Sequence, residues 1–326
     1  MKTISFYLDS FGRGHITREV AVIRAIGNKA EIIVNSAGYL NEIEQMLPDV
    51  RVHRSPFFLK LIPKGLGLDI EMSKAVNFNL REDFEAKVEK VTSDLKRTKP
   101  DLIVADIPAE VFLAAHELDI PIFAISNFGW NIILDELFGN MSTEGKLYSN
   151  AYSKATRTLM LPFHEPMKCF SNRQEVGLLR RRFTKKMKPS KKILSQFGVE
   201  SGFDFKMDNA NFYTIPTDKF EGQDYVASSR AVFSKPGYGV VSEAVAYGVP
   251  IFLKERPNFC ESRYFLKELK ELKGAKIVPD GVDVCKWILN ELDDIDWDAI
   301  KSMQEKYSEN SDEVIASMIL SYLSET

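Results

Sequence analysis

The chain has 326 residues, of which 44% are hydrophobic and 27% charged, and its formal net charge is -3 at pH 7. This length allows two domains of about 150 residues each, and the composition is typical of soluble globular proteins. The near-neutral charge gives no overall attraction to nucleic acid or membranes, so such a partner would require a local patch.

Cysteine and histidine residues show no metal-binding spacing. The three Cys include no C-x-x-C pair, and the four His do not pair at helical or hairpin spacing. We therefore expect neither a metal site nor a disulfide framework. No window approaches the roughly 18 apolar residues of a membrane span, and no signal-peptide pattern precedes the first strand. These features predict a cytoplasmic protein with at most peripheral membrane contact.

The first half of the chain alternates predicted strands and helices. Strands are expected at 3–8, 31–34, 50–53, 100–106, 121–125 and 158–161. Helices are expected at 16–26, 40–46, 73–97, 109–118 and 148–155. This alternation predicts a parallel sheet with helices on both faces. Residues 55–70 interrupt it with Pro and Gly, which predicts a loop folded onto its own domain, or one that holds an acceptor or touches a membrane.

Nine cations lie between Arg173 and Lys192, with few apolar residues among them. We interpret residues 171–191 as a solvated basic linker, the alternative being a site for an anionic acceptor or lipid headgroups. The linker separates a domain at 1–170 from a second domain at 192–310, and a final helix occupies 311–326.

The second half repeats the alternation. Strands are expected at 192–195, 212–215, 231–233, 251–253 and 275–278, with a turn at 198–202. Helices are expected at 240–248, 285–292, 297–307 and 312–323. The two halves together predict an α/β protein with two doubly wound sheets.

The most informative stretch runs from Ser234 to Leu253 and reads as strand end, loop, helix and strand. Gly237 and Gly239 permit a sharp turn, and the unpaired amides of the helix start would hold a phosphate there. Glu243, one turn later, would accept hydrogen bonds from a ribose diol, so we expect it to be a ligand and not a core residue. Glycine-rich turns are common in α/β proteins, so the turn alone does not decide between a site and a structural loop.

A wider pattern extends beyond this stretch and consists of Ser234, Gly237, Ser242-Glu243-Ala244, Gly248-x-Pro250, Arg256 and Asn258-Phe-Cys-Glu261. This pattern resembles the donor-binding half of the GT-B glycosyltransferases, especially the arabinokinase-like group and, more loosely, the UDP-glycosyltransferases. The resemblance covers most of the chain and is strong only at residues 9–19, 100–130 and 234–261. It implies two Rossmann-like domains facing across a cleft, with the last helix returning to the first domain. The donor-binding residues that it implies are Ser234, Gly237, Tyr238, Gly239, Ser242, Glu243, Arg256 and Glu261. Arg256 would hold phosphate and Glu261 sugar hydroxyls, with a surface ion pair as the alternative.

His15 is the candidate general base. It lies at the start of the first helix, where the helix dipole is expected to keep the imidazole neutral, and Asp106 would fix its tautomer. The resemblance implies the same two roles. Two alternatives stay open, namely that His15 caps the helix or that it contacts the donor. The residues expected to line the cleft around it are Gly12, Arg13, Gly14, Asn127 and Trp130.

The resulting hypothesis is a metal-independent glycosyltransferase without a cofactor. It moves a sugar from a nucleotide diphosphate sugar, most simply a UDP-sugar, to a hydroxyl acceptor, and direct displacement with His15 as base would invert the anomeric centre. An anionic glycan and a lipid-linked acceptor both remain open, and no nucleic-acid partner is expected. Two alternatives share the scaffold: a nucleotide-sugar hydrolase and a non-catalytic nucleotide-sugar-binding module.

Overall fold

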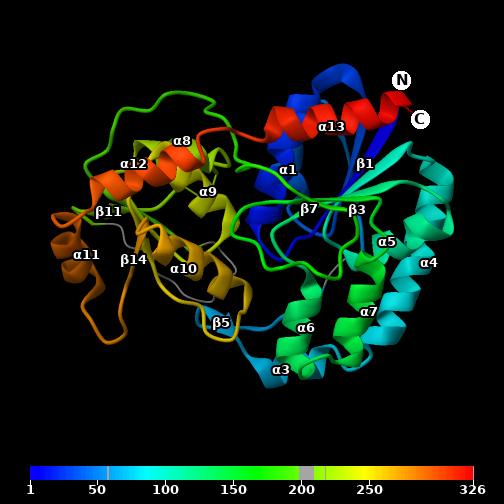
Figure 1. Ribbon diagram of the computed structural model, residues 1–326, viewed down its shortest axis with the longest axis horizontal. Helices are drawn as coiled ribbons and strands as arrows, with labels where there is room; N and C mark the ends of the chain where they lie inside the picture. The colour runs from blue at the N-terminus through cyan, green and yellow to red at the C-terminus, as the bar shows by residue number, and fades with distance from the viewer. Residues whose placement is uncertain (57–58, 198–208, 217, 326) are drawn as a thin grey trace. The chain divides into compact units, whose positions relative to one another are not determined.

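The structure, a computed structural model, describes residues 1–56, 59–197, 209–216 and 218–325. The expected turn at 198–202 lies outside these residues. The chain folds into two compact units (Figure 1). Unit 1 comprises Met1–Ile62, Asp69–Gly177 and Ser311–Thr326, and unit 2 comprises Pro63–Leu68 and Leu178–Asn310.

Unit 1 is built on a seven-stranded sheet whose strands are all parallel, in the order β3-β2-β1-β6-β7-β8-β9. Its strands are β1 (Thr3–Leu8), β2 (Glu31–Ser36), β3 (Arg51–Arg54), β6 (Leu102–Asp106), β7 (Ile122–Ser126), β8 (Arg157–Met160) and β9 (Arg173–Glu175). The predicted parallel sheet is confirmed. The strand order reverses between β1 and β6, and ligands of open α/β sheets bind beyond the carboxyl ends of strands at such a reversal.

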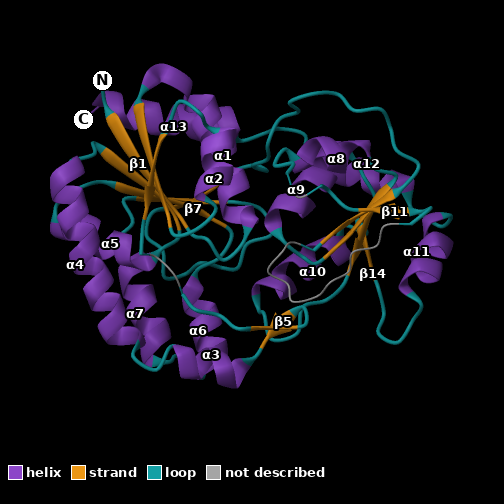
Figure 2. Ribbon diagram, turned by 180° about the vertical axis from the view of Figure 1, so that it is seen from behind, coloured by secondary structure: helices purple, strands orange, loops and turns teal. Residues whose placement is uncertain are grey.

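Helices cover both faces of this sheet, which explains why every residue of β6 and β7 is buried. The helices of unit 1 are α1 (Arg13–Ile26), α2 (Leu40–Met46), α3 (Ile70–Val76), α4 (Leu80–Thr98), α5 (Ala109–Glu117), α6 (Trp130–Phe138), α7 (Thr143–Tyr152) and α13 (Asp312–Glu325). Helices α1, α2 and α13 lie on one face, and α4, α5 and α7 on the other (Figure 2). The last helix, α13, packs against α1 within unit 1.

Three elements of unit 1 differ from the sequence-based expectation, and one of them, helix α6, was not expected at all. The single helix expected at 73–97 is two helices, because the buried Asn77 side chain donates to the carbonyls of Ser73 and Lys60 and ends α3 there. The strand at 158–161 was expected to be the last of its half, but β9 pairs beyond it. All three residues of β9 are exposed, so this edge strand has no apolar pattern to reveal it.

Unit 2 contains a five-stranded parallel sheet in the order β11-β10-β12-β13-β14. Its strands are β10 (Ile193–Gln196), β11 (Phe212–Tyr213), β12 (Ala231–Ser234), β13 (Ile251–Leu253) and β14 (Ala275–Ile277). Its helices are α8 (Gly222–Ser228), α9 (Tyr238–Tyr247), α10 (Glu261–Glu271), α11 (Val284–Leu292) and α12 (Trp297–Lys306). The strand order reverses between β10 and β12, so α9 begins beside a second topological switch.

A small antiparallel hairpin joins unit 2 from an unexpected part of the sequence. It consists of β4 (Pro63–Lys64) and β5 (Gly67–Leu68), which pair with each other and form a sheet separate from the five-stranded one (β5 is labelled in Figure 2). The expectation that the 55–70 loop folds onto its own domain is therefore wrong for residues 63–68. Leu66 at the tip of the hairpin belongs to the apolar core cluster of unit 2, which supplies the reason.

Part of the predicted linker is also packed into unit 2. Leu178 and Leu179 are fully buried, and the backbone amide of Thr184 donates to the Asp224 carboxylate at 3.0 Å. The interpretation of 171–191 as a solvated linker is therefore wrong for this central part, whereas Lys185 and Lys186 are exposed as expected. The sequence did not predict this burial, because the pair is directly followed by three Arg residues and belongs to no longer apolar pattern.

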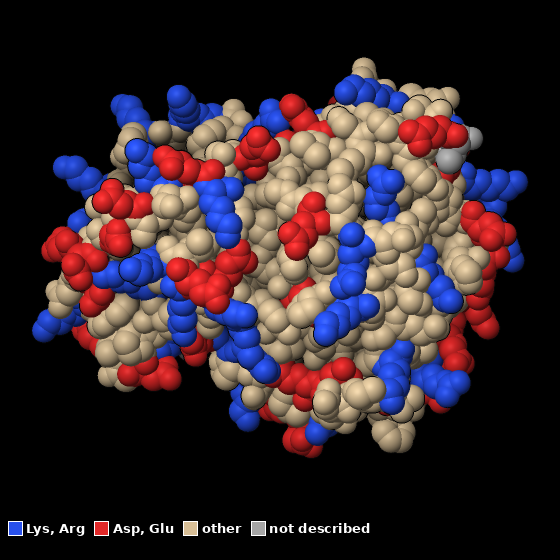
Figure 3. Space-filling view, viewed as in Figure 1, with Lys and Arg blue, Asp and Glu red and all other residues tan. Residues whose placement is uncertain are grey.

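Basic and acidic side chains are interspersed over the face seen in Figure 3, without a large area of one sign. This agrees with the small net charge. Among the described helices, none is both long enough and apolar enough to cross a membrane.

Candidate functional site

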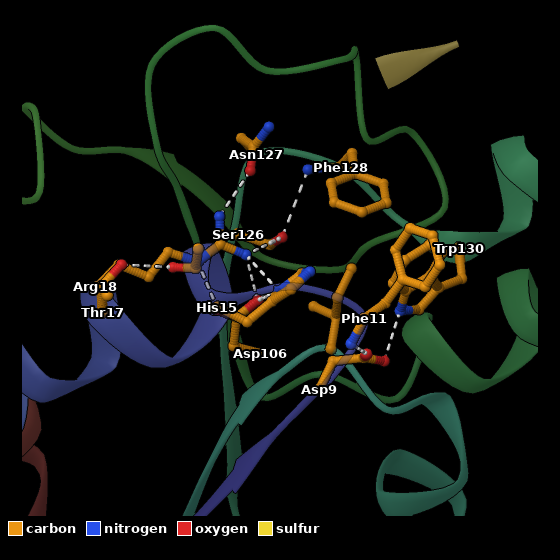
Figure 4. Close-up of polar contacts among 12 residues, drawn as sticks. Asp9, Phe11, His15, Thr17, Arg18, Asp106, Ser126, Asn127, Phe128 and Trp130 are labelled. Carbon is orange, nitrogen blue, oxygen red and sulfur yellow. Dashed lines mark hydrogen bonds and ion pairs between the residues drawn. The ribbon is translucent and has the colours of Figure 1, made fainter. Parts of the chain in front are cut away.

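The two residues predicted to pair lie near the carboxyl ends of β1 and β6: Asp106 is the last residue of β6, and His15 lies in the first turn of α1. Strands β1 and β6 are neighbours, with Leu8 opposite Asp106, and α1 starts a few residues after β1. Nδ1 of His15 lies 2.9 Å from Oδ1 of Asp106 (Figure 4). The side chain of His15 is 10% exposed and that of Asp106 is fully buried. The structure thus brings a histidine and a carboxylate together at the topological switch of unit 1.

Arg18 is a third member of this cluster, and the sequence patterns gave it no role. It lies one turn after His15 on α1, and its Nε and one terminal nitrogen donate to both oxygens of Asp106. Its other terminal nitrogen donates to Oδ1 of Asn127 at 2.7 Å. The i, i+3 spacing of His15 and Arg18 was the available signal. Asn127, predicted to line the site, therefore holds Arg18.

The protonation of the cluster follows from these contacts. Burial opposes ionisation of Asp106, but the Arg18 and His15 charges and hydrogen bonds hold the pKa of Asp106 below its usual value. For His15, burial lowers the pKa, yet the Asp106 carboxylate, aided by Asp9, outweighs it and the pKa of His15 is raised. The pKa of His15 is therefore shifted in the direction opposite to that expected from the helix dipole, and the Asp106 carboxylate is the main group that raises it.

The tautomer of neutral His15 is set by Asp106. An ionised carboxylate only accepts hydrogen bonds, so Nδ1 of His15 must carry the proton in this contact. A terminal nitrogen of Arg18 also lies 3.0 Å from Nδ1, but a protonated Nδ1 cannot accept from it, and we assign the hydrogen bond to Asp106. Nε2 of His15 is then the basic nitrogen.

Aromatic rings surround the imidazole. Trp130 and Phe128 place their ring centroids 5.9 and 6.0 Å from that of His15. Nε1 of Trp130 donates to the buried Asp9 carboxylate at 2.9 Å, and Phe11 packs edge-on against Trp130 (Figure 4). Trp130, predicted to line the site, thus packs beside the imidazole of His15, and its hydrogen bond to Asp9 holds the indole ring in place. Asp9 was not assigned a role, although it directly follows β1.

The remaining predicted residues of this region belong to the start of α1. Gly12 is the N-cap and Arg13 and Gly14 are the first two helical residues. The Arg13 guanidinium lies 3.6 Å from the Glu42 carboxylate and over the Tyr39 ring. Arg13 therefore makes contacts with the α2 region.

Glu19 is a second buried carboxyl close to the cluster. It is fully buried on α1, and neither of its oxygens has a hydrogen-bond partner within the described part of the chain. Burial, with the nearby Asp106 charge, raises the pKa of Glu19 well above its usual value. Burial of this carboxyl without a hydrogen-bond partner therefore favours its neutral form.

In unit 2, the loop between β12 and α9 has the geometry expected of a phosphate site. Gly237 is the extended N-cap of α9, and a Cβ built on it would meet no atom closer than 4.0 Å. The helix ends at Gly248, whose φ of 66° is the left-handed conformation that glycine favours. The first amides of α9 thus lie beyond the carboxyl end of β12, an arrangement suited to an anion.

Three predicted donor-binding residues of this loop have structural hydrogen bonds. The Ser234 hydroxyl donates to the Gln196 carbonyl and so links the ends of β12 and β10. The Ser242 hydroxyl donates to the Gly239 carbonyl at 3.0 Å, within the first turn of α9. The Tyr238 hydroxyl accepts from the Leu179 amide at 3.0 Å. These contacts fix the shape of the loop and the start of α9.

Glu243 of α9 is part of a buried ion pair. Its Oε1 accepts from Nε of Arg181 at 2.9 Å, and the two side chains are 4% and 5% exposed. Burial raises the pKa of Glu243, and the Arg181 charge opposes that rise. The expectation that Glu243 is not a core residue is therefore wrong, because its carboxylate carries a buried partner. The sequence did not predict that Arg181 pairs with Glu243, because Arg181 is one of several cations in the predicted linker.

Arg256 and Glu261 lie in and just after the loop that leaves β13. Nε of Arg256 donates to the Leu66 carbonyl at 3.0 Å, and its guanidinium lies 3.6 Å from the centre of the Phe259 ring. Glu261 is the first residue of α10 and is buried. Within the described residues, no group of three or more His, Cys, Asp or Glu side chains is placed to hold a metal ion.

Two known proteins resemble the chain in sequence, whereas no protein-family model matches it. The chain is 23% identical to L-arabinokinase of Arabidopsis thaliana. The match covers 87% of this chain but only 31% of L-arabinokinase. It is also 23% identical to an uncharacterized glycosyltransferase of Methanosarcina mazei, with 76% of the chain and 78% of that protein covered.

Solved structures resemble the whole chain. The calicheamicin glycosyltransferase CalG4 has a TM-score of 0.68 at 15% identity, with 100% of this chain and 99% of that chain covered. SnogD from Streptomyces nogalater, another glycosyltransferase, has a TM-score of 0.67 at 15% identity and covers 99% of this chain and 100% of its own. Arabidopsis thaliana UGT89C1, solved with UDP-L-rhamnose, has a TM-score of 0.67 at 13% identity, with 99% of each chain covered. The chain therefore has the GT-B fold.

Proposed function

We propose that this chain, which has the GT-B fold, is a glycosyltransferase that moves a sugar from a nucleoside diphosphate sugar to a hydroxyl acceptor. The observation that carries this proposal is the hydrogen bond between His15 and Asp106 at the carboxyl edge of the unit 1 sheet. The fold alone does not define an activity, but a histidine oriented by an ionised carboxylate is the arrangement of a general base.

In the proposed reaction, Nε2 of His15 takes the proton of the acceptor hydroxyl as its oxygen attacks the anomeric carbon. Asp106 stabilises the imidazolium that forms, and Arg18 keeps Asp106 ionised throughout. Proton transfer by a positioned side chain contributes about 100- to 10,000-fold in rate. Attack from the side opposite the leaving group inverts the anomeric centre.

The donor is assigned to unit 2. The amides at the start of α9 would bind the diphosphate, Glu243 the ribose, and Arg256 and Glu261 the phosphate and the transferred sugar. These groups meet the negative charge that leaves with the nucleoside diphosphate, so we propose that the reaction requires neither a metal nor a cofactor. The complex of UGT89C1 with UDP-L-rhamnose supports a UDP-sugar as the first donor to test.

The first experiment is to incubate the protein with UDP-, dTDP- and GDP-sugars, with and without a mixture of hydroxyl acceptors. Nucleotide release and product masses are then measured. A transferase releases nucleotide and adds one sugar mass to an acceptor. Release of free sugar without acceptor would instead identify a hydrolase, and binding without release would identify a binding protein.

A further inference from the structure

The β4–β5 hairpin belongs to unit 2, although the segments before and after it in the sequence both belong to unit 1. Its strands are only two residues long, with Pro63 opposite Leu68 and Lys64 opposite Gly67. An isolated hairpin of this size is not stable in water, so its conformation depends on the contacts it makes. The base of the hairpin is closed by a hydrogen bond from the Asp69 amide to the Ile62 carbonyl at 2.9 Å.

The tip of the hairpin is anchored by Leu66. This residue is 6% exposed and belongs to the core cluster that contains Phe233 of β12 and Phe252 of β13. An apolar residue at the tip of a two-residue turn would ordinarily face solvent. Here its burial fixes the hairpin against the strands that precede the two loops of the proposed donor site.

Three consecutive residues of the hairpin face three consecutive residues of the loop after β13. The Leu66 carbonyl accepts from Nε of Arg256 at 3.0 Å. A Cβ built on Gly67 would lie 1.8 Å from the carbonyl oxygen of Pro257. The Leu68 carbonyl lies 3.5 Å from Nδ2 of Asn258. The two backbones therefore approach so closely that only glycine fits at position 67.

Arg256 is fixed from two sides by this arrangement. Its Nε is held by the hairpin, and its guanidinium stacks over Phe259 at 3.6 Å from the ring centre. A long side chain that must be ordered when a ligand arrives loses affinity, whereas one already held in place does not. A planar guanidinium in a fixed orientation suits two-pronged contact with a phosphate.

We propose that the β4–β5 hairpin is a positioning element of the donor site, which holds the Arg256 guanidinium in the orientation that binds the diphosphate. This inference rests on the proposed function. Leu66 and Gly67 are positioning residues because they act through Arg256. The affinity of unit 2 for the donor thus depends on residues 63–68, which lie more than 100 residues before the rest of unit 2 in the sequence.

The test measures affinity for UDP, dTDP, GDP and inorganic pyrophosphate by calorimetry. Gly67→Ala should weaken binding at least threefold, because the added methyl group displaces Pro257 and Arg256. Leu66→Ala, which removes the anchor without adding atoms, should act in the same direction. Gly65→Asn is the matched control: Gly65 has a φ of 61°, which Asn tolerates, and no atom lies within 4 Å of its Cβ position. It should bind within about twofold of wild type.

Arg256→Met separates a positioning role from a general loss of structure. It should lower affinity about 10- to 100-fold, and adding Gly67→Ala to it should cause no further loss. Wild-type affinity in folded Gly67→Ala and Leu66→Ala variants would overturn the inference, as would an additive loss in the double variant. If wild type binds nucleotides and Arg256→Met binds them equally well, the inference alone fails. If wild type binds none of the four probes, the proposed donor site fails and the inference with it.

Discussion

The Arg181–Glu243 ion pair gives the sharpest prediction for unit 2, because it changes the expected consequence of mutating a candidate ligand. Glu243→Ala would leave Arg181 buried without its partner, and removing one member of a buried pair costs about 3–5 kcal/mol. At about 2–4 °C per kcal/mol, the melting temperature of unit 2 should fall by about 6–20 °C. Nucleotide affinity should also fall if Glu243 contacts the ribose.

The assay is thermal unfolding followed by calorimetry, with Glu271→Gln of α10 as an exposed control that should melt like wild type. A double variant, Arg181→Met with Glu243→Leu, should be more stable than either single variant, because it removes the charges together. If Glu243→Ala melts like wild type, the two side chains do not form a buried pair. A double variant that is less stable than both single variants would also refute the reasoning.

Three further predictions concern unit 1. The acid limb of the kcat/KM profile should have its midpoint above pH 6.5, because the base must be neutral and the pKa of His15 is raised; Asp106→Asn should move this midpoint down. Arg18→Met should move it up, because the Arg18 charge lowers the pKa of His15, whereas a purely structural role would leave the profile in place. Glu19→Met should raise the free energy of unfolding by about 1–3 kcal/mol, measured with urea. This gain should be larger at pH 7 than at pH 5, because unfolded glutamate ionises above about pH 4.3 whereas burial raises the pKa of Glu19 in the folded chain. An equal gain at both pH values would contradict this.

The elements that could be predicted from the sequence have local signals. The apolar runs of β6 and β7 predict buried parallel strands, and both lie in the centre of the sheet. Gly248 predicts the end of α9 because the left-handed conformation at this point favours glycine. The start of α9 was predicted two residues late, since Gly239 reads as loop although it lies in the first helical turn.

What could not be predicted depends on contacts between distant parts of the sequence. Nothing local to residues 63–68 shows that Leu66 enters the core of unit 2, and nothing local to Arg181 shows that its partner is Glu243. The site of unit 1 was predicted in part, because Asp106 ends one strand of the sheet and His15 lies in the turn of helix that follows another. The protonation of His15 was not, because it is decided by carboxylates brought close by the fold.

The central claim is that His15 is the base of a sugar transfer whose donor is held elsewhere. The most direct measurement compares wild type and His15→Ala for nucleotide affinity and for transfer to a hydroxyl acceptor, using the same preparations. The account predicts transfer about 100- to 10,000-fold slower with nucleotide affinity nearly unchanged. Near-normal transfer would show that His15 is not the base, and loss of nucleotide binding would show that it is a donor ligand instead.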